Sequence, residues 1–172
     1  ALYSYVYCLI RMGARDKAIS KLGTFSEEDD EFVGEVDIAD LYVELNLYKE
    51  AAYWFEKGWD KYWKRPDWIS RYIYSLFKLE KMELANKIIL KVINEKKLEI
   101  KETYEEECDE YWTESDKQEH IKELFDEIVE YESMSKRIIN GFVPSMEFNT
   151  SIKTGCYLFG CLRHNHPEYN VR

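Results

Sequence analysis

The stretch that decides the fold is ADLYVELNLYKEAAYWFEKG, residues 39–58. Two other stretches align with it without gaps, VYCLIRMGARDKAISKLGTF at 6–25 and IYSLFKLEKMELANKIILKV at 73–92. An alanine occupies the same column in all three, at Ala18, Ala51 and Ala85, so the spacing is 33 and then 34 residues. A period in this range is typical of proteins built from stacked supersecondary units.

The shared columns predict a helix–turn–helix unit. Apolar or aromatic residues recur nine positions before and four positions after each alanine, which places them on one buried face of each of two helices. The small alanine lets these helices approach closely. Gly13 and Asn46 fall where the first helix must end, and both residue types suit a left-handed C-cap, whereas Glu80–Lys81 is a poor turn signal at the same place. The columns nine before and four after are Leu9, Tyr42 and Leu76, and Leu22, Phe55 and Ile89.

This unit resembles the tetratricopeptide repeat (TPR) family over residues 1–100. Val6 and Ile73 replace the small residue expected in the first helix, which indicates a variant repeat. The resemblance implies an α-solenoid with a concave surface that binds peptides or proteins and rarely supports chemistry. A plain helical bundle with accidental register is the alternative. The matching residues of the central unit are Ala39, Tyr42, Leu47–Tyr48, Glu50–Ala51, Phe55, Gly58 and Pro66, the last closing the repeat.

Three regions are expected in an all-α chain. Residues 1–100 would form about three TPR-like hairpins, 101–140 acidic capping helices, and 141–172 an irregular tail packed on the repeats. Within them, 116–140 has the apolar period of one long helix, which Asp116 can cap at its start and Gly141 at its end. The expected stripe comprises Ile121, Leu124, Phe125, Ile128, Val129, Tyr131, Met134 and Ile138.

Charge is segregated along the chain. The 172 residues carry 24 Lys and Arg against 34 Asp and Glu, a formal net charge of −10. Residues 26–40 hold eight acids and no base, and residues 102–132 hold fourteen acids against Lys117 and Lys122. The remainder therefore carries +10. Segregation of this kind suits electrostatic steering of a basic partner, the alternative being solvated helix faces, and it argues against duplex nucleic acid as the main ligand.

Other features of the sequence exclude several classes of protein. No stretch approaches the roughly 18 apolar residues that a membrane-spanning helix needs. Residues 2–10 are apolar but lack a preceding basic region and a following small-residue cleavage site, so we expect no signal peptide and a cytoplasmic location. Four Cys are too few for a disulfide framework. No cofactor, phosphate-loop or nucleophile motif is present, so we expect neither a cofactor nor an enzyme.

The first helix of each repeat would line the concave groove. The residues there mix polar with aromatic side chains, which suits a peptide or protein surface better than a small apolar ligand. An ordinary solvated helix surface is the alternative. The groove candidates are Tyr5, Asp40, Glu44, Arg71, Tyr74 and Lys78.

Aromatic side chains crowd the second repeat, where residues 53–63 are expected to form one helix. Phe55, Trp59 and Tyr62 would share its core side, whereas Trp54 and Trp63 lie off that stripe. Trp and Tyr are frequent interface hot spots, although these rings could equally cap the core between repeats. The stretch 102–115 is a further helix or an acidic flap. The acidic and aromatic flank candidates are Trp54, Trp63, Glu106, Asp109, Glu110 and Trp112.

The tail carries four side chains of types that bind zinc, Cys156, Cys161, His164 and His166. Their C-x4-C-x2-H-x-H spacing matches no standard zinc unit and is compressed for tetrahedral closure. Two buried thiols beside two surface histidines is the simpler interpretation, and a Cys156–Cys161 disulfide is disfavoured in the cytosol. We therefore predict no metal site.

Together these features predict a non-enzymatic protein–protein interaction module with a basic protein partner. Its sharper form is a bacterial immunity or antitoxin-type inhibitor that captures a basic nuclease, although no diagnostic immunity motif is present. The alternative is a peptide-binding adaptor or regulatory TPR protein that uses the groove. A domain of a larger scaffold is a third possibility.

Overall fold

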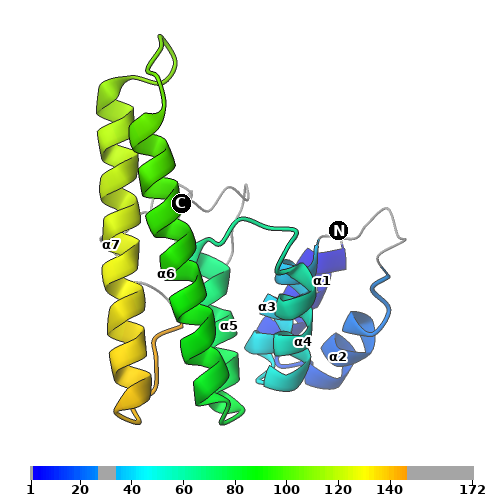
Figure 1. Ribbon diagram of the computed structural model, residues 1–172. Helices are drawn as coiled ribbons and strands as arrows, with labels where there is room; N and C mark the ends of the chain where they lie inside the picture. Colours follow the sequence, from blue (N-terminus) through cyan, green and yellow to red (C-terminus); the bar gives the residue numbers. More distant parts are fainter. Residues whose placement is uncertain (1, 27–33, 147–172) are drawn as a thin grey trace, which may run out of the picture.

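A computed structural model of the chain describes residues 2–26 and 34–146, and every regular element in these ranges is an α-helix (Figure 1). The all-α prediction is therefore confirmed for the described residues. None of the described helices is both long enough and apolar enough to cross a membrane. The helices are α1 (Leu2–Arg11), α2 (Arg15–Leu22), α3 (Glu35–Glu44), α4 (Tyr48–Gly58), α5 (Pro66–Lys78), α6 (Met82–Glu105) and α7 (Glu114–Ile139).

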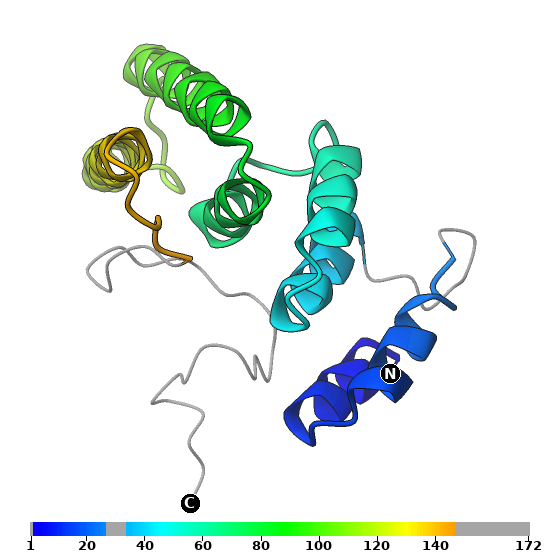
Figure 2. The ribbon, with the colours of Figure 1, turned by 90° about the horizontal axis from the view of Figure 1, so that it is seen from below.

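Successive helices pack as hairpins. α1 pairs with α2, α3 with α4 and α5 with α6, while α3 also contacts α1 and α5. α4 packs on α5, and α7 packs along α6. Seen from below, the hairpins follow one another across the molecule in chain order, with α7 beside α6 at one edge (Figure 2).

The three hairpin turns share one backbone geometry. Gly13, Asn46 and Glu80 have φ values of 74°, 56° and 59°, in the left-handed region. The N–H of the residue after each of them donates to the carbonyl five positions earlier, at 2.9 Å in all three turns. This bond closes a Schellman motif, which satisfies a carbonyl at the end of the first helix. The left-handed turns predicted at Gly13 and Asn46 are confirmed, and Glu80 makes the same turn without a favourable side chain.

The predicted alanine column is buried in each hairpin. Ala18, Ala51 and Ala85 have no exposed surface, and each donates its backbone N–H to the carbonyl four positions earlier at 3.0 Å. The residues four positions later are also buried. A side chain larger than Ala would push the two helices of the hairpin apart, because interiors are close-packed.

The main core is formed by buried residues from all five helices α3 to α7, and aromatic rings lie at its centre. The Phe55 ring lies 6.1 Å from that of Trp68 and 5.6 Å from that of Tyr72, and Trp59 meets Trp68 edge-on at 5.9 Å. A second cluster joins α1, α2 and α3. Phe55 and Trp59 thus lie on the core side, as predicted, while Tyr62 is only partly buried.

Several expected boundaries were wrong. α4 ends at Gly58, so the helix expected over 53–63 stops five residues early and Trp63 lies in the following loop. Pro66 begins α5, where its missing N–H costs nothing, instead of closing the second repeat. α6 continues through residue 100 to Glu105, so residues 102–105 extend it and 106–113 form a loop.

The long helix expected over 116–140 begins at Glu114, two residues early. Thr113 is its N-cap, and Asp116 completes a capping box with it instead of capping the helix alone. Gly141 follows the helix with φ 75°, as predicted. Phe125 and Val129 are exposed, because the apolar stripe is wider than the face that meets α6.

Candidate functional site

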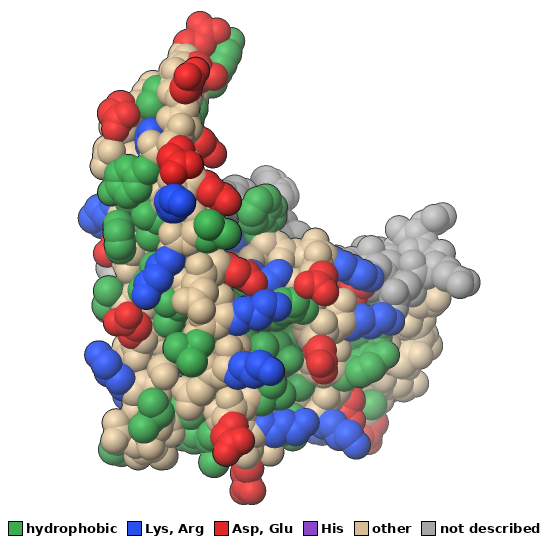
Figure 3. Space-filling model, in the orientation of Figure 1, with side chains coloured by type: hydrophobic (Ala, Val, Ile, Leu, Met, Phe, Trp, Pro, Cys, Tyr) green, Lys and Arg blue, Asp and Glu red, His purple; other side chains and the backbone are tan. Residues whose placement is uncertain are grey.

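α6 and α7 form an arm that projects beyond the other described helices (Figure 1). They contain 24 and 26 residues, so the arm is about 36 Å long at 1.5 Å per residue. Asp and Glu side chains gather at its projecting end (Figure 3). We call residues 102–116 the acidic tip. It contains eight Asp and Glu and no Lys or Arg, and all eight are exposed.

The loop of the acidic tip is held by its own hydrogen bonds. Asp109 Oδ1 accepts the backbone N–H groups of Tyr111 at 2.8 Å and Trp112 at 2.7 Å. The Asp109 N–H in turn donates to the Trp112 carbonyl at 3.0 Å. Thr113 and Asp116 then exchange the two hydrogen bonds of the capping box. These bonds fix the backbone before any partner arrives, which lowers the entropy cost of binding.

A buried lysine closes the base of the acidic tip. Lys117 Nζ, from the first turn of α7, donates to the carbonyls of Tyr104 at 3.0 Å and Glu106 at 2.8 Å. These carbonyls lie at the C-terminus of α6, where a cation also meets the negative end of the helix dipole. Because Lys117 is buried, its charge is directed to the backbone and leaves the exposed carboxylates un-neutralised.

A second buried lysine joins the two helices lower in the arm. Lys96 of α6 pairs with Glu127 of α7. Burial raises the pKa of the Glu127 carboxyl, although Lys96 opposes that shift. The arm therefore carries buried ionic contacts as well as an apolar seam.

Five glutamates of the acidic tip remain available to a partner. They make no side-chain hydrogen bond or ion pair within the described residues. Tyr104 is exposed beside them, and Tyr111 is 86% exposed. Hydrogen bonds from Thr113 hold the pKa of Asp116 below its ordinary value, so this part of the tip stays anionic in mild acid. The five glutamates are Glu102, Glu105, Glu106, Glu107 and Glu110.

The predicted acidic and aromatic flank is only partly brought together. Glu106, Asp109, Glu110 and Trp112 all lie in the acidic tip, where Trp112 packs edge-on against His120 at 5.9 Å.

The other two flank residues lie elsewhere. Trp54 is half-buried on α4, between the Tyr53 ring and the Lys57 ammonium. Trp63 is 82% exposed in the α4–α5 loop. The two tryptophans therefore do not belong to the acidic tip.

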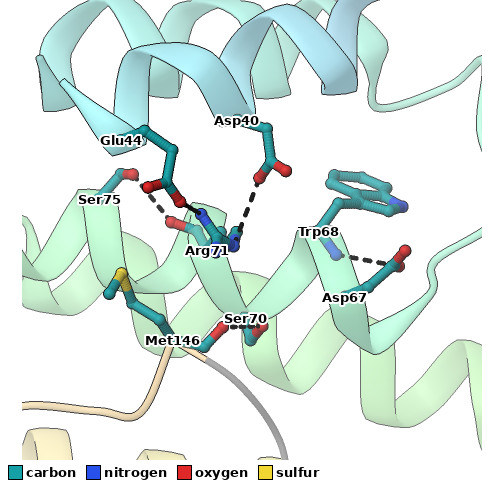
Figure 4. Close-up of polar contacts among 8 residues, drawn as sticks. All are labelled: Asp40, Glu44, Asp67, Trp68, Ser70, Arg71, Ser75 and Met146. Atoms are coloured by element: carbon teal, nitrogen blue, oxygen red, sulfur yellow. Dashed lines mark hydrogen bonds and ion pairs between the residues drawn. The ribbon is translucent and has the colours of Figure 1, made fainter. Parts of the chain in front are cut away.

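Three predicted groove residues form an ionic cluster between α3 and α5 (Figure 4). Arg71 Nη1 donates to Glu44 at 2.9 Å, and Arg71 Nε lies 3.4 Å from Asp40 Oδ1. Arg71 is only 3% exposed and Asp40 only 7%. Lining an open groove was therefore the wrong expectation for these two, because tertiary packing pairs their charges between helices.

The remaining groove candidates are accessible. Tyr5 is half exposed on α1. Tyr74 is partly buried against the edge of Tyr48 at 5.8 Å, and Lys78 Nζ lies 5.5 Å from its ring centroid. Beyond α7, the chain returns to α5, where the Ser70 hydroxyl donates to the Met146 carbonyl at 2.7 Å (Figure 4).

The buried carboxylate of Glu35 was not among the residues predicted from the sequence. Glu35 accepts hydrogen bonds from Lys61 and from the Tyr62 hydroxyl, the latter at 2.8 Å. Burial raises the pKa of Glu35, but these two bonds outweigh it, so its pKa is below the ordinary value. Burial and the bond to Glu35 raise the pKa of Tyr62 to about 12. Glu35 is one of seven acids in residues 26–37, and nothing in the sequence distinguishes it from the other six.

Two lysines that the sequence analysis did not select converge on one tryptophan. The Nζ atoms of Lys64 and Lys91 lie 4.7 and 4.5 Å from the centroid of the Trp59 ring. Lys64 also donates to the carbonyls of Trp59 and Tyr62. Neither lysine meets a carboxylate within the described ranges. We call Trp59, Lys64 and Lys91 the basic cluster.

Within residues 2–26 and 34–146, no three His, Cys, Asp or Glu side chains form a group that could hold a metal ion. The candidates Cys156, Cys161, His164 and His166 lie outside the described residues. The chain matches no protein-family model, no curated protein and no solved structure.

Proposed function

We propose that this protein is a non-enzymatic interaction module whose acidic tip binds a basic protein. The observation that carries the proposal is the set of five glutamates, exposed and without a cation partner among the described residues, at the end of a projecting helix pair. Exposed Tyr104 and Tyr111 add the aromatic surface that hot spots commonly use. The glutamate charges would attract a basic partner at long range, and the two tyrosine rings would pack against it once it is bound.

The position of the tip favours fast capture. The carboxylates at the end of the arm lie far from the Lys and Arg side chains that are spread over α4 and the lower part of α6 (Figure 3). Little of their field is therefore cancelled within a Debye length of roughly 8 Å. Such segregated charge raises association rates toward about 10⁸ M⁻¹s⁻¹ at low salt. In the sharper form of this proposal, the basic partner is a toxin nuclease and the protein is an immunity-type inhibitor in the cytoplasm.

In this proposal the hairpins of residues 1–100 form a TPR-like solenoid that carries the arm. The repeated Schellman turns and the buried alanines support that assignment. An adaptor that binds peptides in the groove is the alternative function. It is less well supported, because Asp40 and Arg71 are buried and paired with each other.

Affinity capture at two salt concentrations tests the proposal. The protein is immobilised and exposed to lysate of its source cells at about 50 mM and about 500 mM NaCl. We expect one basic protein, retained at low salt and released at high salt. A variant with Glu106, Glu107 and Glu110 changed to Lys should lose it.

A matched control changes three exposed glutamates away from the tip, Glu50, Glu56 and Glu83, to Lys. The net charge shifts equally, so retention by this control assigns binding to the tip and not to overall charge. A second variant, Tyr74→Ala, tests the groove. Loss of the partner in Tyr74→Ala, with retention in the tip variant, would favour the adaptor instead.

A further inference from the structure

The solvent face of α6 has an ordered charge pattern. Lys91, Leu98 and Glu105 are seven residues apart, so they lie within about 20° of one line along the helix. All three are exposed, with Leu98 at 55%. The opposite side of α6 is its buried face. That face comprises Ala85, Ile89, Val92, Ile93, Lys96, Ile100 and Thr103.

Charge changes sign at the middle of this line. Lys87 and Lys91 precede Leu98, whereas Glu102 and Glu105 follow it. Figure 3 shows the same division, with Lys and Arg spread over α4 and the lower part of α6 and acids at the projecting end. Residues 49–101 as a whole carry 13 Lys and Arg against eight Asp and Glu. Such a face is complementary to a copy of itself that runs in the opposite direction.

We propose that two copies of this chain pair through α6, antiparallel, with Leu98 of one copy against Leu98 of the other. Lys91 of each copy then faces Glu105 of the other. The partner here is a second copy and not the basic protein of the proposed function, so pairing through the acidic tip competes with capture of that protein.

The basic cluster gives the acidic tip a place to dock. Lys64 and Lys91 bring two ammonium groups to the Trp59 ring without a carboxylate partner among the described side chains. Trp63, adjacent to Lys64 in sequence, is 82% exposed. In the antiparallel pair, the tip that follows Glu105 lies over this cluster, so its carboxylates meet the two lysines.

The contact cannot form within one copy. Lys91 and Glu105 are fourteen residues apart on one continuous helix, a separation of about 21 Å. In a pair related by a two-fold axis at Leu98, the same contact forms twice. Both copies then use this surface on each other, so the assembly stops at a dimer. Helices α1–α5 of each copy lie beside the N-terminal part of its α6 (Figure 1). In the antiparallel pair, these helices of the two copies therefore lie at opposite ends of the dimer.

Sedimentation equilibrium of the full chain over a concentration series tests this pairing. At about 50 mM NaCl we expect a species of twice the monomer mass of 20.7 kDa, which dissociates at about 500 mM. Leu98→Lys places two ammonium groups at the two-fold axis and should leave only monomer. Val129→Lys is the matched control, because Val129 is an exposed apolar residue on α7. It should still dimerise.

A charge exchange separates pairing from general electrostatics. Lys91→Glu alone and Glu105→Lys alone should each weaken the dimer by about tenfold or more, because like charges then face each other twice. The double variant restores opposite charges and should restore the dimer. A monomer at every concentration in the unmodified chain would overturn the proposal, as would a dimer that survives Leu98→Lys. Since Lys91→Glu leaves the acidic tip intact, loss of pairing and loss of a foreign partner are distinguishable.

Discussion

Replacing Arg71 by Met should destabilise the protein by about 3 kcal/mol. Arg71 is 3% exposed and joins α5 to Asp40 and Glu44 of α3. Without the guanidinium, the carboxylate of the buried Asp40 loses its ion pair with Arg71, whereas the more exposed Glu44 can be hydrated. Breaking a buried ion pair by removing one partner costs about 3–5 kcal/mol, and one buried carboxylate places this case at the lower end. That is a large part of the roughly 5–15 kcal/mol that stabilises a domain.

Urea unfolding followed by tryptophan fluorescence measures this loss, because Trp68 of α5 and the neighbouring Trp59 lie in the core. The second variant, Arg71→Met with Asp40→Asn, also removes the carboxylate charge that was paired with Arg71 and should recover more than half of the loss. Glu44→Gln alone should cost less than about 1 kcal/mol. If Arg71→Met unfolds within about 1 kcal/mol of the unmodified chain, or if Asp40→Asn restores nothing, the cluster does not stabilise the α3–α5 contact as described.

Three further changes test other features by similar measurements. Glu80→Gly should stabilise the chain by about 0.5–1 kcal/mol in urea unfolding, because glycine adopts φ 59° without the steric cost of a Cβ. Lys117→Met should cost about 1.5–3 kcal/mol and speed amide exchange in residues 104–113, since two carbonyls lose a charged donor. Stability should fall as pH rises from 10 toward 12, because Tyr62 ionises in the unfolded chain near 10 and in the folded chain at about 12. Tyr62→Phe should flatten that fall in a series of unfolding curves, and an unchanged slope would contradict it.

The helical hairpins could be predicted because their signals are local. Gly13 and Asn46 tolerate the left-handed conformation, and the alanine column carries the close approach of the helices. Glu80 could be placed only by its register with the other two turns, since its own side chain disfavours the conformation. Trp63 was assigned to a helix because aromatic spacing continues past Gly58, although the helix does not.

The charged contacts could not be predicted in the same way. Arg71 was expected to line an open groove, and nothing in the sequence indicated that Lys117 is buried, because a charged residue is normally exposed. Their burial depends on partners 27 or more residues away or on carbonyls at the end of another helix. Such partners are defined only once α3 meets α5, or α7 turns back on α6. The sequence therefore predicted the acidic composition of the tip, but not the arm that presents it.

The separation of the acidic tip from the core has a consequence for how the protein can evolve. Asp109, Thr113, Asp116 and Lys117 maintain the loop. The five glutamates without side-chain contacts among the described residues contribute little to folding, so substitutions there should be nearly neutral for stability. Selection can then alter recognition at these positions without compensating changes in the hairpins. Lineages under pressure from a changing partner would accumulate differences at the tip first.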